Sequence, residues 1–322
     1  HRAIENLSEI NAIGHRVVAG GEIFDKSVII DEKTLKGIED CSKLAPLHNP
    51  AAILGIKACQ KAMPGVPMVA AFDTAFHQTM PKENYLYPIP YEYYEKYGIR
   101  KYGAHGTSHK YVTQRVEKLM NKDIKDLKIV TCHLGQGASL CAVQGGKSVD
   151  TSMGLTPLGG ITMVTRSGDL DPSVVTAIMK KENLTADEVE SILNKKSGLT
   201  AVSKLVPDFR EIENASNEGN EDAIIAINKF VSTIAQYIAR YAAVMEGIDA
   251  VVFTGGIGEN QFRIRSKICK KLKFMGLDLD EEKNNEFRSE GKISKEDSKV
   301  EIWVVPTDEE LMIAQDTLDL IK

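Results

Sequence analysis

The feature that most constrains this chain is the stretch from Lys128 to Pro172, in which two apolar strands joined by glycines precede a charged cluster. The pattern predicts a strand over Lys128 to His133, a turn at Gly135-Gln136-Gly137, and a second strand over Ala138 to Val143. Glycines at a hairpin tip let backbone N–H groups approach a phosphate and hold it without a charged side chain. An ordinary hairpin has the same pattern, so the turn alone leaves both interpretations open.

The segment after the hairpin favours a functional site. Thr165-Arg166-Ser167-Gly168-Asp169 places charged and hydroxyl groups between an apolar run and a helix start at Pro172. Charged and hydroxyl groups are unfavourable in a hydrophobic core, whereas a ligand site commonly contains them. The cluster therefore favours a functional hairpin over an ordinary one.

The length of 322 residues predicts two domains, because a single hydrophobic core seldom grows beyond about 250 to 300 residues. With 43% hydrophobic and 26% charged residues, the composition is typical of a soluble globular protein. The net charge of −5 and the lack of a basic run interleaved with aromatic residues argue against a nucleic-acid partner. No apolar run approaches the roughly 20 residues that cross a bilayer, so we expect no membrane segment.

The cysteines argue for a reducing compartment. Their number is odd, their positions are scattered, and no pair has CxxC spacing, so neither a disulfide framework nor a zinc site is expected. We therefore predict a cytoplasmic protein with free thiols at Cys41, Cys59, Cys132, Cys141 and Cys269. The chain has no initiator Met and opens within a helical pattern that ends at Gly14, so we expect further residues upstream.

Two charged residues occupy or follow short apolar strands. Arg16 lies in the predicted strand His15 to Val18, where an ordinary edge-strand arginine in water is the alternative. Asp73 ends the predicted buried strand Val66 to Phe72. The carboxyl end of a strand is where open α/β sheets bind ligands, although a helix cap also explains a carboxylate there.

His105 lies between two glycines, after a Tyr- and Pro-rich stretch, Tyr85 to Tyr102, that we expect to be a surface connection. Thr107 or Ser108 is predicted to cap the following helix, which leaves His105 on a loop that can face a ligand. Zinc-binding helices carry a glutamate directly after the first histidine, and none follows His105. The His105/His109 pair is therefore not expected to bind zinc.

A second glycine turn, Gly255 to Asn260, ends the predicted strand Asp249 to Thr254 and leads into a helix whose first N–H groups can hold an anion or a purine. The turn matches neither GxGxxG nor GxxxxGK(S/T), so a Rossmann fingerprint and a P-loop are absent. The preceding helix, Glu221 to Met245, carries an apolar stripe that includes Ile224 and indicates a core or subunit contact. Two strand-turn units separated by helices predict a duplicated α/β architecture.

Two further helices are expected to begin at capping residues. Asn49 is predicted to cap a helix that starts at Pro50. Near the end of the chain, a strand over Val300 to Val305 precedes a helix capped by Thr307 or Asp308.

Eight motifs, in order along the whole chain, resemble the acetate kinase family: HRVVAGGE, FDTAFH, GAHGTSH, CHLGQGASL, TPLGGITMVTRSGDLDP, PDFRE, FTGGIGEN and PTDEEL. The resemblance implies a duplicated actin-like (ribonuclease H-like) ATPase fold, with nucleotide in the cleft between two domains of related topology. It divides the chain into residues 1–77, to which 310–322 return, and residues 78–309, which bind nucleotide and dimerise. It also implies that the family's amino-terminal phosphate hairpin lies upstream of this sequence.

The resemblance further implies roles for individual residues. Arg16 faces the substrate carboxylate, Asp73 occupies the catalytic acid/base position, and Glu309 binds Mg²⁺ or Mn²⁺. His105 and Arg166 stabilise the transferring phosphoryl group, which suits a reaction that depends on positive charge around the phosphate oxygens. The substrate methyl group lies in a pocket formed by Val18, Leu47, Ala104 and Pro157. ATP or ADP is held by His133, Leu134, Gly135, Gln136, Gly137, Asp208, Phe209, Arg210, Gly256, Ile257, Gly258, Glu259 and Asn260.

Elementary chemistry argues against one of these roles. A small carboxylic acid is already ionised at pH 7, so its oxygen attacks phosphorus without a base and Asp73 has no proton to remove. We therefore expect Asp73 to position the metal or the substrate.

The sequence departs from the family pattern at five positions, where Ala19 replaces His, Ala104 replaces Phe, Gln136 replaces Asn, Gly159 replaces Glu and Val164 replaces Gly. Gln136 keeps an amide for phosphate contact, whereas Val164 removes backbone freedom. Ala104 leaves room for one or two more methylenes, each worth about 0.8 kcal/mol when buried. This change favours propionate, unless Met163 or Tyr102 fills the gap and leaves acetate preferred.

The chain is therefore expected to phosphorylate acetate, or another short-chain carboxylate, with ATP, reversibly and by in-line transfer to an acyl phosphate. Propionate kinase is one alternative. The other is a nucleotide-binding module without turnover, because the amino-terminal phosphate loop is absent from the sequence. Joint retention of Arg16, Asp73, His105 and Arg166 favours an enzyme. The expected partners are the carboxylate, ATP and a second copy of the chain in a homodimer.

Overall fold

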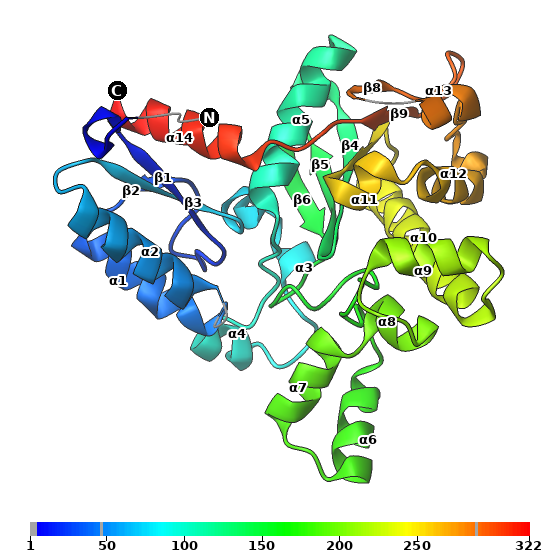
Figure 1. Ribbon diagram of the computed structural model, residues 1–322, viewed down its shortest axis with the longest axis horizontal. Coiled ribbons are helices and arrows are strands. Elements are labelled where there is room, and N and C mark those ends of the chain that lie inside the picture. The colour runs from blue at the N-terminus through cyan, green and yellow to red at the C-terminus, as the bar shows by residue number, and fades with distance from the viewer. Residues whose placement is uncertain (1–4, 46–47, 287–288) are drawn as a thin grey trace.

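The computed structural model describes residues 5–45, 48–286 and 289–322. Two β-sheets organise the chain, and helices flank each of them (Figure 1). Within the described ranges, no helix is both long and apolar enough to cross a membrane.

The smaller sheet has the strand order β1-β3-β2 and consists of β1 (Ile13–Val17), β2 (Val28–Ile29) and β3 (Met68–Phe72). β1 runs parallel to β3, whereas β2 is antiparallel to it. Figure 1 shows this sheet between α14 (Glu309–Ile321) and the pair α1 (Glu32–Asp40) and α2 (Asn49–Ala62). Because helices cover both faces, every residue of β3 is buried, in agreement with its continuous apolar run.

The larger sheet has six strands in the order β6-β5-β4-β7-β9-β8. In chain order these are β4 (Lys128–Leu134), β5 (Ala138–Gln144), β6 (Lys147–Thr151), β7 (Ala250–Thr254), β8 (Gly291–Lys292) and β9 (Glu301–Val304). β4, β7 and β9 are parallel, and His133 of β4 lies opposite Thr254 of β7. The glycine turns that follow β4 and β7 therefore meet at one edge of the sheet, where parallel strands present their carboxyl ends.

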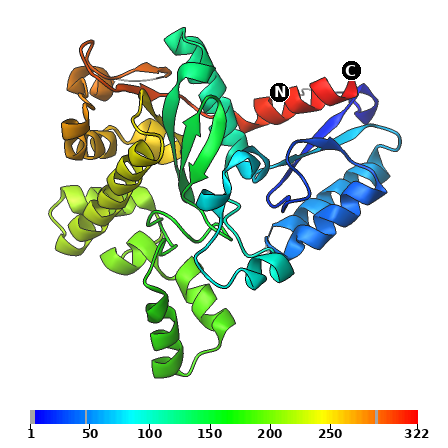
Figure 2. The same cartoon turned by 180° about the vertical axis from the view of Figure 1, so that it is seen from behind.

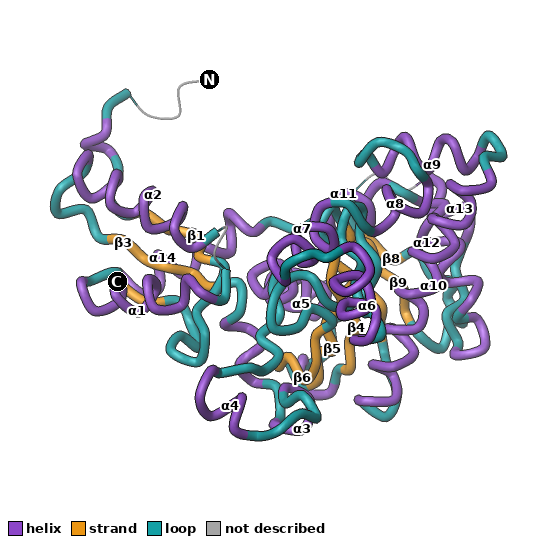
Figure 3. Tube along the Cα trace, turned by 90° about the horizontal axis from the view of Figure 1, so that it is seen from below, coloured by secondary structure: helices purple, strands orange, loops and turns teal. Residues whose placement is uncertain are grey.

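Helices cover both faces of the larger sheet. α10 (Glu221–Val244) lies on one face and buries Phe230 in the main hydrophobic cluster. α5 (Gly106–Met120) lies on the other face, where Val112 joins a second cluster with Trp303. Figure 3 shows β4 and β5 between these two helices. The apolar stripe of α10 is therefore core.

Shorter helices connect these layers: α3 (Lys82–Tyr85), α4 (Glu92–Tyr97), α6 (Pro172–Glu182), α7 (Ala186–Lys195), α8 (Gly198–Ser203), α9 (Phe209–Asn217), α11 (Gly255–Asn260), α12 (Phe262–Lys271) and α13 (Glu281–Glu286). Single turns of 3-10 helix occur at Leu7–Glu9, Cys41–Lys43, Ala75–Thr79, Ile124–Asp126 and Lys273–Met275. Figure 2 shows α6 and α7 extending away from both sheets.

The predicted α/β fold and the glycine hairpin between β4 and β5 are confirmed. Asp308, one of the two residues predicted to cap the last helix, accepts the N–H of Leu311 at 2.8 Å and is the N-cap of α14. The second glycine turn is shorter than predicted. Of its three glycines, Gly255, Gly256 and Gly258, only Gly255 has a positive φ, of 77°, and α11 begins at that residue.

The predicted opening helix is wrong. The first part of this prediction, residues 1–4, lies outside the described residues. From Glu5 to Gly14 the only helical turn is the 3-10 turn Leu7–Glu9, and Gly14 lies within β1. A Cβ added at Gly14 would lie 2.5 Å from Cγ2 of Ile313 in α14. The glycine thus permits close contact between a strand and a helix, and it does not end a helix.

Two predicted caps are also wrong. Asn49 is the first residue of α2, and its side chain bonds the N–H and C=O of Ala19 at 3.0 and 2.9 Å. α5 begins at Gly106, so Thr107 and Ser108 lie buried in its first turn. Both errors have one cause, because these polar side chains bond distant segments in place of the local helix end.

Two smaller details differ from the prediction. The stretch Tyr85 to Tyr102 contains α4, whose Tyr94 hydroxyl donates to Glu22 at 3.0 Å. Ile224 of α10 is 36% exposed and lies off the buried stripe. The helix buries Ala223 and Ile227 on either side of it.

Candidate functional site

Arg16 and Asp73 form an ion pair at the carboxyl ends of β1 and β3. Nε of Arg16 donates to both carboxylate oxygens at 3.1 Å, and Nη2 donates to Oδ2 at 2.5 Å. The Asp73 side chain is 1% exposed and that of Arg16 is 46% exposed. Among the described residues, Nη1 of Arg16 has no protein partner. Asp73 thus anchors a guanidinium that keeps one edge open to a ligand.

His105 precedes α5 in the left-handed conformation, with a φ of 56° that is uncommon outside glycine. The next residue, Gly106, donates its N–H to the carbonyl oxygen of Asp73 at 2.8 Å. A Cβ added at Gly106 would clash with that same oxygen. This close approach joins the His105 loop to the end of β3.

Three histidines form a buried cluster under this loop. The rings of His105 and His133 stack with centroids 4.3 Å apart. Ser139 Oγ lies 2.9 Å from Nδ1 of His105 and 2.8 Å from Nε2 of His109. Burial holds the pKa values of His105 and His109 well below the usual range and lowers the pKa of His133 to about 4. All three rings are therefore neutral at pH 7.

Arg166 presents a second guanidinium. Its Nη1 donates to the carbonyl oxygen of Pro157 at 3.1 Å, and its own carbonyl accepts from Met163 at 3.0 Å. In the part of the chain that the structure describes, it has no carboxylate partner, and burial lowers its pKa. A half-buried cation without a counter-ion is suited to bind an anion.

The hairpin tip lies against both Arg166 and His105. A Cβ added at Gly137 would lie 3.2 Å from Nη1 of Arg166 and 3.7 Å from Nε2 of His105. The structure therefore brings together these three predicted residues and the nearby Arg16 and Asp73. We call these five residues the central site.

Glu309, the first residue of α14, faces the central site. Its Oε1 is buried and has no hydrogen-bond partner within the described residues. Burial raises the pKa of Glu309, and the charge of Asp73 raises it further, while Arg16 opposes both effects. An unpartnered carboxylate oxygen near a second carboxylate suits a divalent cation with oxygen ligands.

No group of three His, Cys, Asp or Glu side chains that could hold a metal occurs in the described ranges. Mg²⁺ does not require such a group. It is commonly bound by one or two carboxylates, with water and substrate phosphates completing its coordination shell. Glu309 and Asp73 therefore fit Mg²⁺ better than a fully protein-coordinated metal.

A pocket of about 440 Å³ lies where the two glycine turns meet. We call it the sheet-edge pocket, and it is lined by Gly135, Gln136, Asp208, Phe209, Arg210, Gly256, Ile257, Asn260 and Gln261. All of these except Gln261 are residues that the sequence predicts to hold nucleotide. A Cβ added at Gly256 would meet nothing within 4 Å, so this glycine faces open space. Asp208 caps α9 by accepting the N–H of Arg210 at 2.8 Å.

Several predicted residues are engaged elsewhere. Leu134 and Ala104 are buried in the main hydrophobic cluster. Glu259 accepts the N–H groups of Gly255 and Thr307 at 2.8 and 3.2 Å and so ties α11 to the segment before α14. Gly258 is buried within α11. Val18 directly follows β1, and Leu47 lies outside the described residues.

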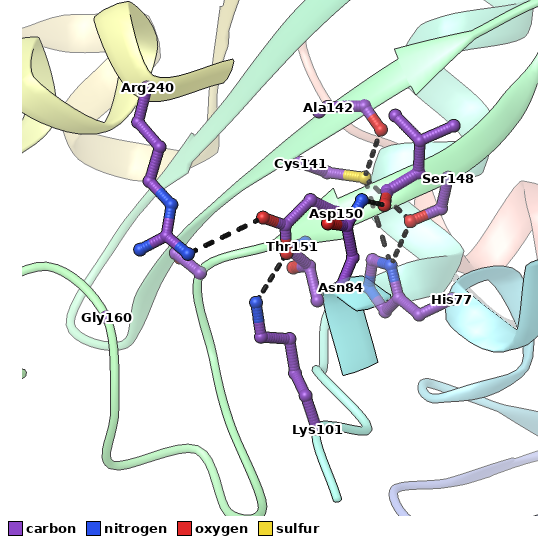
Figure 4. A network of polar contacts seen from close by, with 12 residues as sticks. His77, Asn84, Lys101, Cys141, Ala142, Ser148, Asp150, Thr151, Gly160 and Arg240 are labelled. Atoms are coloured by element: carbon purple, nitrogen blue, oxygen red, sulfur yellow. Dashed lines mark hydrogen bonds and ion pairs between the residues drawn. The ribbon is translucent and has the colours of Figure 1, made fainter. Parts of the chain in front are cut away.

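A second polar network fixes the segment before His105 (Figure 4). Nε2 of His77 lies 2.9 Å from the carbonyl oxygen of Ala104, which can only accept, so this nitrogen carries the ring proton. Nδ1 of His77 then accepts from Ser148 at 2.8 Å, and burial lowers the pKa of His77 to about 4. Lys101 pairs with Asp150 at 2.5 Å. Side chains of β6 thus hold this segment at both ends.

Two residues near the site were not predicted from the sequence. His48 lines a cavity of about 250 Å³ together with Pro157 and Arg166. Burial lowers the pKa of His48, and the charge of Arg166 lowers it further. The only sequence signal for His48 is its position before a helix start. Ser139 is a hydroxyl residue in an otherwise apolar strand, which is also weak.

Comparisons with known proteins agree with this geometry. The model of the acetokinase family matches residues 1–315. An acetate kinase of Caldanaerobacter subterraneus subsp. tengcongensis is 59% identical over 320 residues, which are 99% of this chain and 80% of that protein. The crystal structure of Porphyromonas gingivalis acetate kinase has a TM-score of 0.96 at 48% identity and covers 99% of this chain and 80% of its own.

A propionate kinase from Francisella tularensis is similar as well. Its crystal structure has a TM-score of 0.93 at 48% identity, over 98% of this chain and 80% of that one. The family match over nearly the whole length, the 59% identity to an acetate kinase and the shared fold agree with one another. The chain therefore belongs to the acetokinase family.

Proposed function

We propose that the chain transfers the γ-phosphoryl group of ATP to the carboxylate of acetate, reversibly, giving acetyl phosphate and ADP. Family membership supports ATP as the co-substrate and a carboxylate as the acceptor. The observation that carries the proposal is the convergence of Arg166, His105 and Gly137 beside the Arg16–Asp73 pair. Such a set can surround a phosphoryl group with donors.

In the reaction, an acetate oxygen forms a bond to the γ-phosphorus while the bond from that phosphorus to the β,γ-bridging oxygen breaks. ADP leaves, and no proton moves, because acetate is ionised at pH 7. The protein must therefore supply position and positive charge. Arg166 and His105 direct N–H groups at the phosphoryl oxygens, and the open Nη1 of Arg16 orients the acetate carboxylate.

Asp73 serves as a positioning group in this scheme. Both of its oxygens accept from Arg16, and the hydroxyl of Thr107 lies 3.5 Å from Oδ1. Its main-chain carbonyl also anchors the loop of His105 through Gly106. A carboxylate with these contacts orients both sides of the site, and the chemistry does not require it as a base.

We assign Mg²⁺, or Mn²⁺ in its place, to Glu309 with Asp73 beside it. When bound, the cation would offset the charge of the β- and γ-phosphates. The unpartnered Oε1 of Glu309 and the mutual repulsion of the two carboxylates support this assignment.

The sheet-edge pocket is proposed to hold the adenosine. Open space at Gly256 leaves room for a planar base, and Phe209 offers an apolar wall. The backbone from Gly135 to Gly137 leads from this pocket to Arg166. A nucleotide bound in the pocket would therefore direct its phosphates along the hairpin tip into the central site.

Acetate is proposed as the preferred substrate, with propionate as the alternative. Ala104 is 3% exposed and belongs to the same buried cluster as Met153 and Met163. This packing supports the interpretation that neighbouring side chains fill the space left by the missing ring.

The setting of the enzyme is part of the same proposal. Free thiols at all five cysteines support a cytoplasmic location.

The contact of α14 with Gly14 supports the return of residues 310–322 to a first domain of residues 1–77, with 78–309 as the second. Exposed Val206 and Ile225 offer apolar area for a homodimer, which light scattering of the purified protein tests.

The test combines turnover with binding. Purified protein incubated with acetate, ATP and Mg²⁺ is assayed for acyl phosphate by hydroxylamine trapping, and ADP is titrated calorimetrically in parallel. We expect acetate-dependent hydroxamate and saturable ADP binding. Binding of ADP without any hydroxamate would favour the binding module and overturn the enzyme assignment.

A further inference from the structure

A chain of buried hydrogen bonds ends at His105. Thr131 Oγ1 lies 2.7 Å from Nδ1 of His109, and Nε2 of His109 lies 2.8 Å from Ser139 Oγ. Ser139 Oγ lies in turn 2.9 Å from Nδ1 of His105. Thr131, His109 and Ser139 are 0% exposed. Water therefore has no access to the chain except at its last nitrogen, Nε2 of His105, which faces the hairpin tip.

Ser139 Oγ could accept from both rings, but within the described residues its own buried O–H would then have no acceptor. With Ser139 donating to one ring and accepting from the other, the protons in this chain can be arranged in only two ways. Each histidine is neutral and carries one ring proton, and Ser139 has a single O–H to share between two rings. The chain therefore donates either from Thr131 towards His105 or in the reverse sense. The two senses place the ring proton of His105 on different nitrogens, Nε2 in the first case and Nδ1 in the second.

The two senses differ at Thr131. Within the described residues, its hydroxyl has no hydrogen-bond partner other than His109. In the reverse sense this buried O–H would have no acceptor, whereas in the first sense every proton of the chain is used. A buried donor without an acceptor costs about 1 to 3 kcal/mol, which is enough to select one arrangement.

We propose that Ser139 is a positioning residue that sets the tautomer of His105, so that Nε2–H points into the central site as a fixed hydrogen-bond donor. His109 and Thr131 hold the serine hydroxyl in the required direction. Neutral His105 then offers its proton to a phosphoryl oxygen without turning its ring. The assignment rests on the proposed function for its purpose, although the tautomer itself can be observed without turnover.

The first test reads the tautomer directly. Protein labelled with ¹⁵N-histidine is studied by long-range ¹H–¹⁵N correlation, and His105 is assigned from the spectrum of His105→Asn. We expect a proton on Nε2 of both His105 and His109 in the resting protein. A proton on Nδ1 of His105 would overturn the proposal.

Two matched variants separate the hydrogen-bond chain from general packing. Thr131→Val removes the first hydroxyl of the chain, and Thr113→Val removes an equally buried hydroxyl that donates to the main-chain carbonyl of His109 at 2.7 Å. We expect Thr131→Val to mix the tautomers of His109 and His105, and Thr113→Val to leave both unchanged. Equal spectra for the two variants would contradict the assignment.

Kinetics supply the second test. Ser139→Ala is expected to lower kcat about tenfold, which is less than the loss on removing a donor outright, with KM for acetate and ATP changed less than about twofold. In a His105→Asn background, Ser139→Ala should not lower kcat further, because its effect on kcat depends on the His105 ring. A full additional loss would assign Ser139 a merely structural role. Correct tautomers in a protein without acyl phosphate formation would refute the proposed function and leave the inference standing.

Discussion

The central site and the sheet-edge pocket adjoin each other but are built in opposite ways. Arg16, Asp73, His105 and Arg166 come from four separate segments, and buried or half-buried partners position each of them. The sheet-edge pocket uses short local segments that follow β4 and β7 or begin α9, and its Asp208–Arg210 ion pair lies at the surface.

This difference indicates which kinetic constant each region controls. A donor fixed by buried contacts acts mainly on the transition state, where charge develops, and so affects kcat. A pocket of glycines and exposed side chains binds ground state and transition state alike, and so affects KM. The following variants test this division, from the largest expected effect to the smallest.

Arg166→Gln should have the largest effect. Loss of an unpaired guanidinium at the transferring group is expected to lower kcat about 10³-fold while the Kd for ADP changes less than about threefold. Hydroxamate kinetics and calorimetry measure the two quantities. Arg115→Gln, which removes a surface partner of Glu290, is the matched control and should retain activity. A drop in kcat of less than tenfold would contradict the role of Arg166.

Glu309→Gln should lower kcat about 10²-fold and also raise stability without metal at neutral pH. The pKa of Glu309 is raised in the folded state, which therefore binds this proton more tightly than the unfolded chain does. The contribution of Glu309 to stability is complete below its usual value of 4.5 and is lost as pH rises through the folded value.

Urea unfolding of wild type and Glu309→Gln in chelator checks this sign. The variant should be the more stable protein at pH 7.5, and the difference should disappear in acid. A variant less stable than wild type at pH 7.5 would show that the Glu309 carboxylate is stabilised by protein contacts and would argue against a metal role.

Asp73→Asn should lower kcat about 10²-fold through loss of orientation at Arg16, and destabilise the fold by about 1 to 3 kcal/mol because the buried carboxylate loses its charge-assisted hydrogen bonds to the half-exposed Arg16. The pH dependence of turnover should keep its shape, since no proton is removed from acetate. If one limb of the profile disappears near a raised carboxylate pKa, Asp73 acts as a base after all.

Gly256→Ala should raise KM for ATP about tenfold and leave kcat within about twofold, because its methyl group would enter the space assigned to the base. The protein itself has room, since nothing lies within 4 Å of the added Cβ. Gly55→Ala is the matched control, because its Cβ also meets nothing within 4 Å and Gly55 lies on α2. Equal KM values for both variants would place the adenosine elsewhere.

Ala104→Phe should have the smallest effect on specificity. Overpacking of the main hydrophobic cluster, which contains Ala104, is expected to cost about 1 to 3 kcal/mol of stability and to leave the propionate-to-acetate ratio of kcat/KM within about twofold of wild type. A clear fall of this ratio in the variant would show that the alanine does enlarge the pocket, and would restore propionate as a favoured substrate.

Local patterns were predicted well because they depend on near neighbours. The hairpin between β4 and β5 follows from alternating strands and a glycine tip, and Asp308 caps α14 through an N–H three residues away. The resemblance in eight motifs, and not a local pattern, named most of the lining of the sheet-edge pocket in advance, including Gly256 and Asn260 of α11 and Asp208 to Arg210 at the start of α9.

Errors arose where a residue type can form either a local contact at a helix end or a contact with a distant segment of the chain. Gly14 was predicted to end a helix, but its lack of a side chain allows α14 to pack closely against β1. Asn49 was predicted to cap a helix, but its side chain forms hydrogen bonds with the backbone of Ala19. His105 occupies the cap position that was assigned to Thr107 or Ser108. In each case tertiary contacts outweighed a local preference worth about 1 kcal/mol.

The sequence by itself determined the α/β fold, the two glycine turns and the identity of the charged residues in the central site. Only the tertiary structure decided how those charges are used. Arg16 and Asp73 are 57 residues apart, and Ser139 is 34 residues from His105, so no local pattern records that they bond. Burial then gives these contacts their strength, because a polar group removed from water must find its partner within the protein.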